Sequence, residues 1–285
     1  MPPALFEEII KYLCDNYEIR SLETIVEKCT PSAKKVATVL FDDGYKDNIE
    51  YAVPILKKYN CPASFYVVTS CIDNNIPTWT YIVDHLFQHT RKNILNLEMD
   101  YVPLAFRSPD CSDYQKRLAI GSKLKPWMKS LSNFRRKEVL DQLRSAFNDV
   151  DLPQKLMMNW NDLRQMKAEG YIIGSHSVTH PLLATIKEEE ELSFELRESG
   201  NRIKAELGEF PQTISYPVGS FDQQVINGAR KAGYQMGLAV EQRFYDTNKD
   251  EIFAIPRVEL YNESMWKTKL RISGIYNWLK RRIAK

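Results

Sequence analysis

The sequence predicts an α/β fold built on parallel strands, and three observations favour it. The first is an apolar run from Val36 to Phe41, which is typical of a strand buried on both faces. The second is the order that follows, an amphipathic stretch and then another apolar run from Ala63 to Val68, which makes a strand–helix–strand unit. The third is that the same alternation returns near residue 157 and continues to Arg257.

The segments before and between these units are predicted to be helical. Apolar residues between Leu5 and Leu13 fall on one helical face. Residues from about 72 to 156 interrupt the alternation with two aromatic-rich pieces and a stretch rich in Lys and Arg near 116–147. We interpret this region as a helical insertion between barrel elements, which either covers a site or forms a solvated layer.

Helices and strands alternate again after the insertion. Asn159 can cap a helix that begins at Trp160, and Gly170 ends that helix. A long charged helix is expected over Lys187–Leu207, and a shorter one stops at Gly233. Four more strands are expected at Tyr171–Gly174, Thr213–Ser215, Met236–Val240 and Ile252–Ile255.

The composition is that of a folded chain. Of its 285 residues, 44% are hydrophobic, which is too many for an intrinsically disordered protein. No apolar run reaches the roughly 18 residues that cross a bilayer, and the first residues lack the pattern of a signal peptide. We therefore expect a cytoplasmic or peripherally membrane-bound protein. The motifs at the strand ends, rather than the composition, indicate one barrel over residues 1–262.

The net charge of +2 conceals a basic C-terminal segment, residues 263–285. From Trp266 to Lys285 there are seven Lys or Arg and no Asp or Glu; without them 32 basic residues face 37 acidic ones. Nucleic-acid-binding proteins usually spread their basic residues over a folded face, so we expect no nucleic acid partner. The segment either docks on the barrel as a helix or makes peripheral contact with an anionic membrane.

Polar clusters come directly after four of the predicted strands. In α/β barrels the active site lies at the edge formed by the carboxyl ends of the strands. The four clusters are Asp42-Asp43, His176 with His180, Tyr216-Pro217-Val218-Gly219, and Arg257.

The histidine and aspartate clusters together predict a metal site. The i, i+4 spacing of His176 and His180 would place both imidazoles on one face of a helical turn, where they can hold a cation with a third ligand. Such a pair alone is more often structural, but Asp42 and Asp43 supply carboxylates at another strand end. Adjacent residues leaving a strand point in different directions, so one Asp can bind the metal while the other acts as a base.

Three segments of the chain resemble the successive motifs of the polysaccharide deacetylases, the NodB-homology domains of carbohydrate esterase family four. The resemblance covers roughly residues 5–260. It implies a distorted (β/α)7 TIM-like barrel that hydrolyses N-acetyl groups from an N-acetylated amino-sugar poly- or oligosaccharide, releasing acetate. The segments are Phe41-Asp42-Asp43-Gly44-Tyr45, Ser175-His176-Ser177-Val178-Thr179-His180-Pro181 and Ser215-Tyr216-Pro217-Val218-Gly219-Ser220-Phe221-Asp222.

The resemblance also implies a chemical role for the first two motifs. Asp43, His176 and His180 correspond to ligands of a divalent metal, foremost Zn²⁺, with Co²⁺ or Ni²⁺ as alternatives. Asp42 corresponds to the catalytic base that removes a proton from the attacking water.

The third motif corresponds to substrate and oxyanion binding. The backbone N–H of Val218 would stabilise the tetrahedral oxyanion, with Tyr216 and Pro217 beside the substrate. The family's usual Arg in this motif is replaced by Ser215-Tyr216. Arg257 would then steady the base, or else form a surface or barrel-closing ion pair.

A second departure concerns the general acid. Many family members have a late His that protonates the leaving amine, and no His follows His180 here. This absence favours the alternative of a catalytically weakened saccharide-binding or scaffold protein. A metal hydrolase acting on a non-sugar amide is a further alternative, because the same barrel could support it. In the insertion, His85 and His89 are interpreted as an ordinary helix face rather than as a general acid or ligands of a second metal. Trp79 and Tyr81 are interpreted as packing residues rather than as residues that stack on sugar rings.

Overall fold

Five parallel strands form the centre of the protein, and the computed structural model describes residues 1–27 and 34–275. The strands are β3 (Val39–Phe41), β4 (Ala63–Val67), β5 (Ile172–Ser175), β6 (Thr213–Ser215) and β7 (Met236–Leu238). Their order in the sheet equals their order in the sequence, and all neighbours are parallel. This curled sheet is that of a distorted (β/α) barrel, so the predicted fold class is confirmed.

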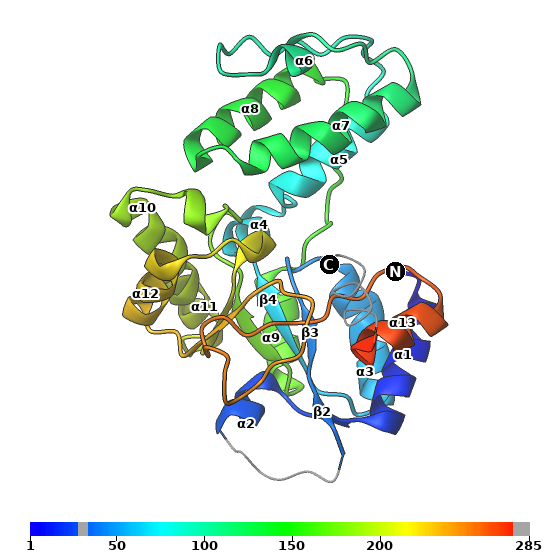
Figure 1. The fold of residues 1–285 in the computed structure, drawn as a ribbon, viewed down its shortest axis with the longest axis vertical. Coiled ribbons are helices and arrows are strands. Elements are labelled where there is room, and N and C mark those ends of the chain that lie inside the picture. Colours follow the sequence, from blue (N-terminus) through cyan, green and yellow to red (C-terminus); the bar gives the residue numbers. More distant parts are fainter. Residues whose placement is uncertain (28–33, 276–285) are drawn as a thin grey trace.

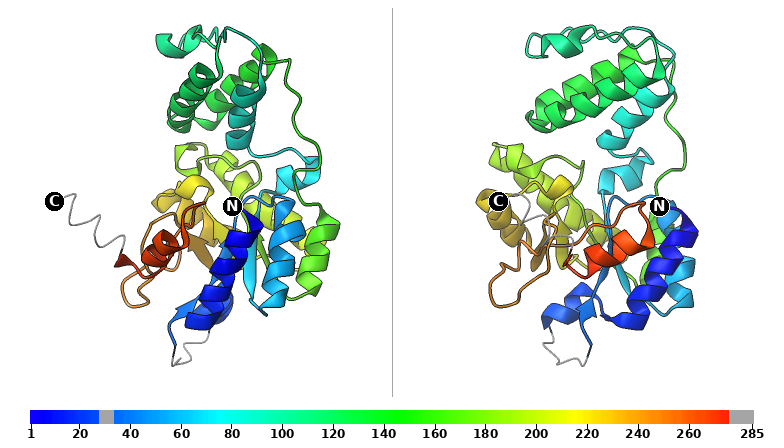
Figure 2. Two further views of the ribbon diagram at one scale, coloured as in Figure 1. Left: turned by 90° about the vertical axis from the view of Figure 1, so that its right-hand side faces the viewer. Right: turned by 45° about the vertical axis from the view of Figure 1, so that its right-hand side comes forward.

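Helices cover this sheet and bury two apolar clusters against it (Figures 1 and 2). One cluster joins β3, β4 and β5 to the helices α1 (Pro3–Asn16), α3 (Val53–Lys58) and α9 (Trp160–Ala168). The other surrounds β6 and includes side chains of α10 (Glu189–Ser193) and α12 (Gln223–Ala232). All five residues of β4 are buried, as expected for a central strand of a parallel sheet.

Two predicted strands differ from the observed ones. Val36–Phe41 is not one buried strand, because β2 (Val36–Ala37) pairs with β1 (Glu18–Ile19) in a separate sheet, and β3 begins only after Thr38. Val36 is 37% exposed, so the assumption of burial on both faces was wrong at this end. The strand expected at Ile252–Ile255 is reduced to a single parallel bridge between Leu238 and Ile255.

The long charged helix expected after residue 187 is interrupted by wider turns. α10 leads into a π-helix, η3 (Phe194–Glu198), and then into α11 (Ser199–Leu207), which ends at Gly208 in the left-handed conformation. Glu195 and Leu196 of η3 are both buried. A second π-helix, η1 (Asn48–Ala52), precedes α3. Turns of this kind are rare and occur often at functional sites.

The predicted start of the helix after the insertion is confirmed. Asn159 caps α9 through a capping box, in which its side chain accepts from the N–H of Asp162 and the Asp162 carboxylate accepts from the N–H of Asn159. The helix ends at Ala168, and Gly170 follows with φ +90°. This motif re-establishes the barrel after the insertion.

The insertion is helical and has a core of its own. It contains α5 (Trp79–His89), α6 (Leu104–Arg107), α7 (Tyr114–Lys129) and α8 (Asn133–Ala146). Figure 1 shows it beyond the end of the sheet where β4 leads into α4 (Thr69–Asn74). Its core includes Phe87, Leu124 and Leu143, all at most 1% exposed. Within the described ranges, no helix is long and apolar enough to cross a membrane.

Near the C-terminus, α13 (Met265–Ile272) docks on the barrel. Ile272 joins the cluster that contains α1, and Arg271 pairs with Glu263 at 2.8 Å. Trp266 is 61% exposed. This part of the basic segment fits the docked-helix interpretation, whereas residues 276–285 lie outside the described residues. The remaining elements are α2 (Leu22–Glu27), η2 (Leu183–Thr185) and η4 (Pro217–Gly219).

Candidate active site

The polar clusters predicted at strand ends meet at one edge of the sheet. Asp42 and Asp43 follow β3, His176 follows β5, and the third motif follows β6. The register pairs Val67 with Ser175, and the His176 N–H donates to the Val67 carbonyl at 2.9 Å. Because neighbouring parallel strands end together, their next residues project into one shared space.

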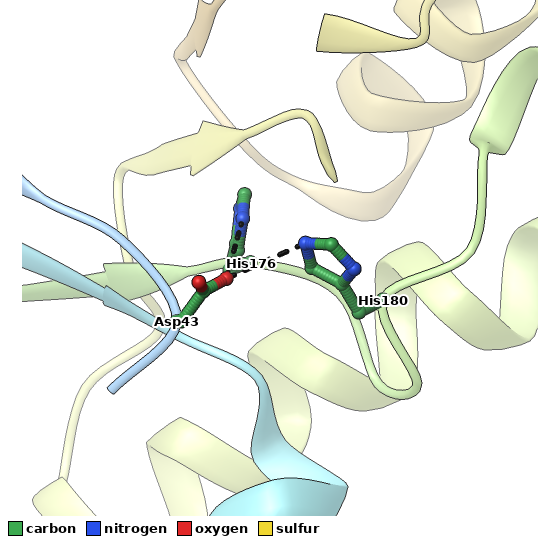
Figure 3. A group of neighbouring side chains, drawn as sticks. All are labelled: Asp43, His176 and His180. Atoms are coloured by element: carbon green, nitrogen blue, oxygen red, sulfur yellow. Dashed lines mark ion pairs between the residues drawn. The ribbon is translucent and has the colours of Figure 1, made fainter. Parts of the chain in front are cut away.

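Asp43, His176 and His180 form a compact group of ligand atoms (Figure 3). Oδ1 of Asp43 lies 3.5 Å from Nε2 of His176 and 3.4 Å from Nε2 of His180. Atoms that share a tetrahedral ion at about 2.0–2.2 Å are separated by roughly 3.3–3.6 Å. The observed separations have this value and are long for direct hydrogen bonds. The donor set therefore fits a divalent metal.

The backbone around these ligands differs from the expectation. The segment from His176 to His180 is not a helical turn, and both Ser177 (φ 68°) and His180 (φ 59°) are left-handed. The prediction that a helical i, i+4 face brings the imidazoles together was wrong, because an irregular loop does so instead. Asp42 and Asp43 have different partners, Arg257 and the two histidines respectively, and the backbone is left-handed at Asp43 (φ 72°) and Gly44 (φ 88°).

Hydrogen bonds and burial set the state of each imidazole. Nδ1 of His176 lies 2.7 Å from the carbonyl oxygen of Ser215, so it carries the proton and leaves Nε2 directed at Asp43. Burial lowers the pKa of His180 to about 4, so this ring is neutral at pH 7. Burial also opposes a charge on His176, but the carboxylates of Asp42 and Asp43 outweigh it and raise its pKa.

Asp42 is held by a two-pronged ion pair. Nη1 and Nη2 of Arg257 donate to its two carboxylate oxygens at 2.9 and 2.7 Å, and Nε of the same side chain donates to the carbonyl of Ala239. Burial alone would raise the pKa of Asp42, but the charge of Arg257, followed by that of His176, holds it well below its ordinary value. Arg257 thus contacts Asp42 inside the barrel rather than at a remote surface.

In the third motif, residues 215–222, Val218 is exposed, whereas the side chains of Tyr216 and Pro217 are not. Val218 is left-handed (φ 56°) and 36% exposed, and the hydrogen bonds of the turn are donated by Gly219 and Ser220. The ring of Tyr216 is 0% exposed and stacks on Phe221, and Pro217 is buried too. The expected substrate contact by these two side chains is therefore corrected, because neither side chain is accessible.

The aromatic and histidine residues of α5 stay outside the metal group. Trp79 is 7% exposed, which supports packing, and its Nε1–H donates to the carbonyl of His180 at 3.0 Å. His85 contacts the carbonyl of Asp151, and His89 contacts that of His85. Tyr81 is partly buried, with its ring centroid 6.0 Å from that of Tyr45.

Three contacts of the site were not predicted from the sequence. They are the Ser215 carbonyl on His176, the Trp79 indole on the His180 carbonyl, and the Glu195 carboxylate on the loop between the histidines. A backbone carbonyl has no sequence signal. A charged residue on an otherwise inward helical position, such as Glu195 beside Leu196, is a signal that could have been used.

Comparison with known proteins identifies the family from the sequence. A family model for polysaccharide deacetylases matches residues 30–115 and 132–237, more than half of the chain. The protein YxkH of Bacillus subtilis (strain 168), whose name places it in this family, is 20% identical over 245 residues. The match spans 85% of this chain and 59% of YxkH.

Solved deacetylase structures share the fold. A Streptococcus pyogenes deacetylase, PplD, solved in complex with acetate, has a TM-score of 0.61 at 17% identity, covering 94% of this chain and 85% of its own. A de-N-acetylase from Aggregatibacter actinomycetemcomitans has a TM-score of 0.59 at 18% identity, covering 94% and 88%. IcaB from Ammonifex degensii has a TM-score of 0.60 at 14% identity, covering 92% and 85%. The chain therefore belongs to the polysaccharide deacetylase family.

Proposed function

We propose that the protein hydrolyses N-acetyl groups of an amino-sugar poly- or oligosaccharide with the help of a divalent metal held by Asp43, His176 and His180. The observation that carries the proposal is the position of this ligand group beside the Asp42–Arg257 pair. Bound there, a metal such as Zn²⁺ would polarise the acetamide oxygen and lower the pKa of a bound water. The family and the neighbours named above support the substrate class.

Asp42 is the proton acceptor in this proposal. Arg257 keeps its carboxylate ionised at neutral pH and fixes its orientation through two hydrogen bonds. As a water oxygen bonds to the acetamide carbon, Asp42 takes the proton that the water loses. The carbon–nitrogen bond then breaks, giving acetate and an amine.

The leaving nitrogen also needs a proton, and the four histidines have other contacts. His176 and His180 belong to the ligand group, while His85 and His89 hydrogen-bond to carbonyls of the insertion. In this proposal the carboxyl of Asp42 returns the proton that it took from the water, so that one residue serves first as base and then as acid. The N–H of Val218, at an exposed left-handed turn, stabilises the oxyanion.

The test is acetate release from oligomers of N-acetylglucosamine. Chelator-treated protein is assayed alone and with added Zn²⁺, Co²⁺ or Ni²⁺, and we expect acetate only with metal. Asp42→Asn should lower the rate by about 10²–10⁴-fold, the usual contribution of a general base. Asp47→Asn, a change at an exposed carboxylate five residues along the chain, is the matched control.

Two outcomes would redirect the proposal. Absence of acetate with every metal, while the oligomer still binds, favours the saccharide-binding alternative suggested by the missing late histidine. Full activity of Asp42→Asn refutes the role of Asp42 but leaves the family assignment intact.

A further inference from the structure

A buried carboxylate holds the loop that joins the two histidines. Glu195 of η3 is 2% exposed, and its Oε2 accepts hydrogen bonds from the N–H groups of Val178 and Thr179, both at 2.9 Å. Its Oε1 accepts from the hydroxyl of Thr179 at 2.5 Å. All three donors lie between His176 and His180, so one side chain is hydrogen-bonded to the centre of the loop that carries the two histidine ligands.

This loop needs external support because its backbone is unfavourable. Ser177 and His180 adopt the left-handed conformation, which is disfavoured for residues that carry a Cβ atom. Such conformations persist only when the surrounding structure fixes them. Other elements support the loop as well. The N–H groups of Thr69 and Ser70 in α4 donate to the carbonyls of Ser177 and Val178 at 3.2 and 3.0 Å, and Trp79 donates to the His180 carbonyl.

A carboxylate suits this position for a chemical reason. Successive N–H groups that point in one direction form a small anion-binding surface. A carboxylate has only acceptors, and its two oxygens can serve all three donors at once. Burial raises the pKa of Glu195, and the hydrogen bonds that it accepts from Thr179 and Val178 oppose this rise. The buried guanidinium of Arg136, in the insertion, interacts favourably with Glu191 and Glu195.

We propose that Glu195 is a positioning residue that sets the place of His180 relative to Asp43 and His176, and thereby the metal affinity of the site. This inference rests on the proposed metal-dependent function. Glu195 acts only through the loop, since its hydrogen bonds go to Val178 and Thr179 and to neither histidine ring. Outer partners that orient metal ligands typically contribute 10–100-fold to metal affinity.

The test measures the affinity of the full chain for Zn²⁺ alone, by competition with a chromophoric chelator. Glu195→Asp shortens the side chain by one methylene and withdraws it from the loop. We expect zinc binding to weaken by about 10–100-fold, with faster hydrogen exchange at the amides of Val178 and Thr179. Glu195→Gln keeps the length and one acceptor oxygen, so its zinc affinity should stay near that of the unmodified protein.

A stability-matched control separates positioning from general weakening. Leu196→Ala opens a cavity next to Glu195 in the same turn, because Leu196 is 0% exposed in the adjacent cluster. It should lower the thermal stability and leave zinc affinity unchanged. If Leu196→Ala weakens zinc binding as much as Glu195→Asp does, the effect is structural and the proposal is wrong.

If Glu195→Asp does not fold, a milder variant tests the role of Glu195. Thr179 is exposed, so Thr179→Val removes only the hydroxyl contact with Glu195. It should weaken zinc binding by a smaller factor; unchanged affinity and unchanged exchange contradict the proposal. If the unmodified protein binds no zinc, the metal-dependent function falls together with this inference, whereas equal binding by Glu195→Asp overturns the inference alone.

Discussion

The barrel and the helical insertion are built on different principles, and only the barrel supplies the ligand group. In the barrel, parallel strands end together and bring residues far apart in the sequence, such as Asp43 and His176, within 3.5 Å. In the insertion, α5, α7 and α8 bury a separate core. Its histidine rings lie 4.1 Å apart, centroid to centroid, and hydrogen-bond to backbone carbonyls, outside the ligand group. The same i, i+4 spacing of two histidines therefore belongs to a ligand group in the barrel and to a helix face in the insertion.

The two regions nevertheless meet next to the site. Trp79 of α5 donates to the carbonyl of His180, and Asn133 of α8 donates to Glu191 of α10 at 2.6 Å. Arg136 adds a buried positive charge and lies over the ring of Trp79. The insertion thus acts on the site through the support of His180 rather than by contributing a ligand.

The sharpest test of this contrast compares the two histidine pairs. His176→Ala removes a member of the ligand group and should weaken Zn²⁺ binding by more than the roughly 100-fold loss of an outer partner. His89→Ala, in the insertion, should leave binding unchanged. Zinc titration with circular dichroism as a folding check measures both. Loss of binding in His89→Ala would show that the insertion also holds the metal.

A second prediction concerns the barrel's own ion pair. Arg257→Met frees Asp42 from its two-pronged partner, and the rate of acetate release should fall by about 10²-fold, as for a misplacement of roughly 1 Å. Arg257→Lys should recover only part of the rate, because an ammonium group cannot donate as a planar fork. The zinc affinity of both variants, measured in parallel, should stay unchanged; a parallel loss would mean that Arg257 supports the ligands instead.

The separate cores predict separate losses of stability. Leu143→Ala in the insertion and Leu163→Ala in the barrel both truncate a side chain that is 0% exposed, so each should cost about 2–5 kcal/mol. Hydrogen exchange should show faster opening of α7 and α8 in the first variant and of the sheet in the second. Uniform acceleration in both variants would show that the two regions unfold as one unit.

The smallest effect is expected where the chain returns from the insertion to the barrel. Asn159→Ala removes the capping box of α9 and should lower the free energy of unfolding by about 1 kcal/mol. Chemical denaturation measures the change. Asn161→Ala, two residues later, is the control. The Asn161 side chain accepts from Arg164 at 2.6 Å but makes no cap contact to Asp162, so this change should affect stability less.

The sequence predicted elements well where a local rule decides them. The cap at Asn159, the end of α12 at Gly233 and the buried strand β4 all follow from side-chain chemistry within a few residues. The prediction from sequence was wrong where the choice of neighbouring strand determines which residues are buried. Val36 and Ala37 are as apolar as a core strand, but their partner is β1 rather than β4, so their exposure depends on a neighbour far along the chain.

The sequence by itself determined the family, the parallel α/β barrel and the identity of the residues at the strand ends. These depend on residue type and order, which the motifs preserve. Only the tertiary structure decided that an irregular loop brings His176 and His180 together, that Arg257 meets Asp42, and that Glu195 supports the loop. These contacts join separate elements, and their geometry is fixed by how the strands and helices pack, which no local pattern specifies.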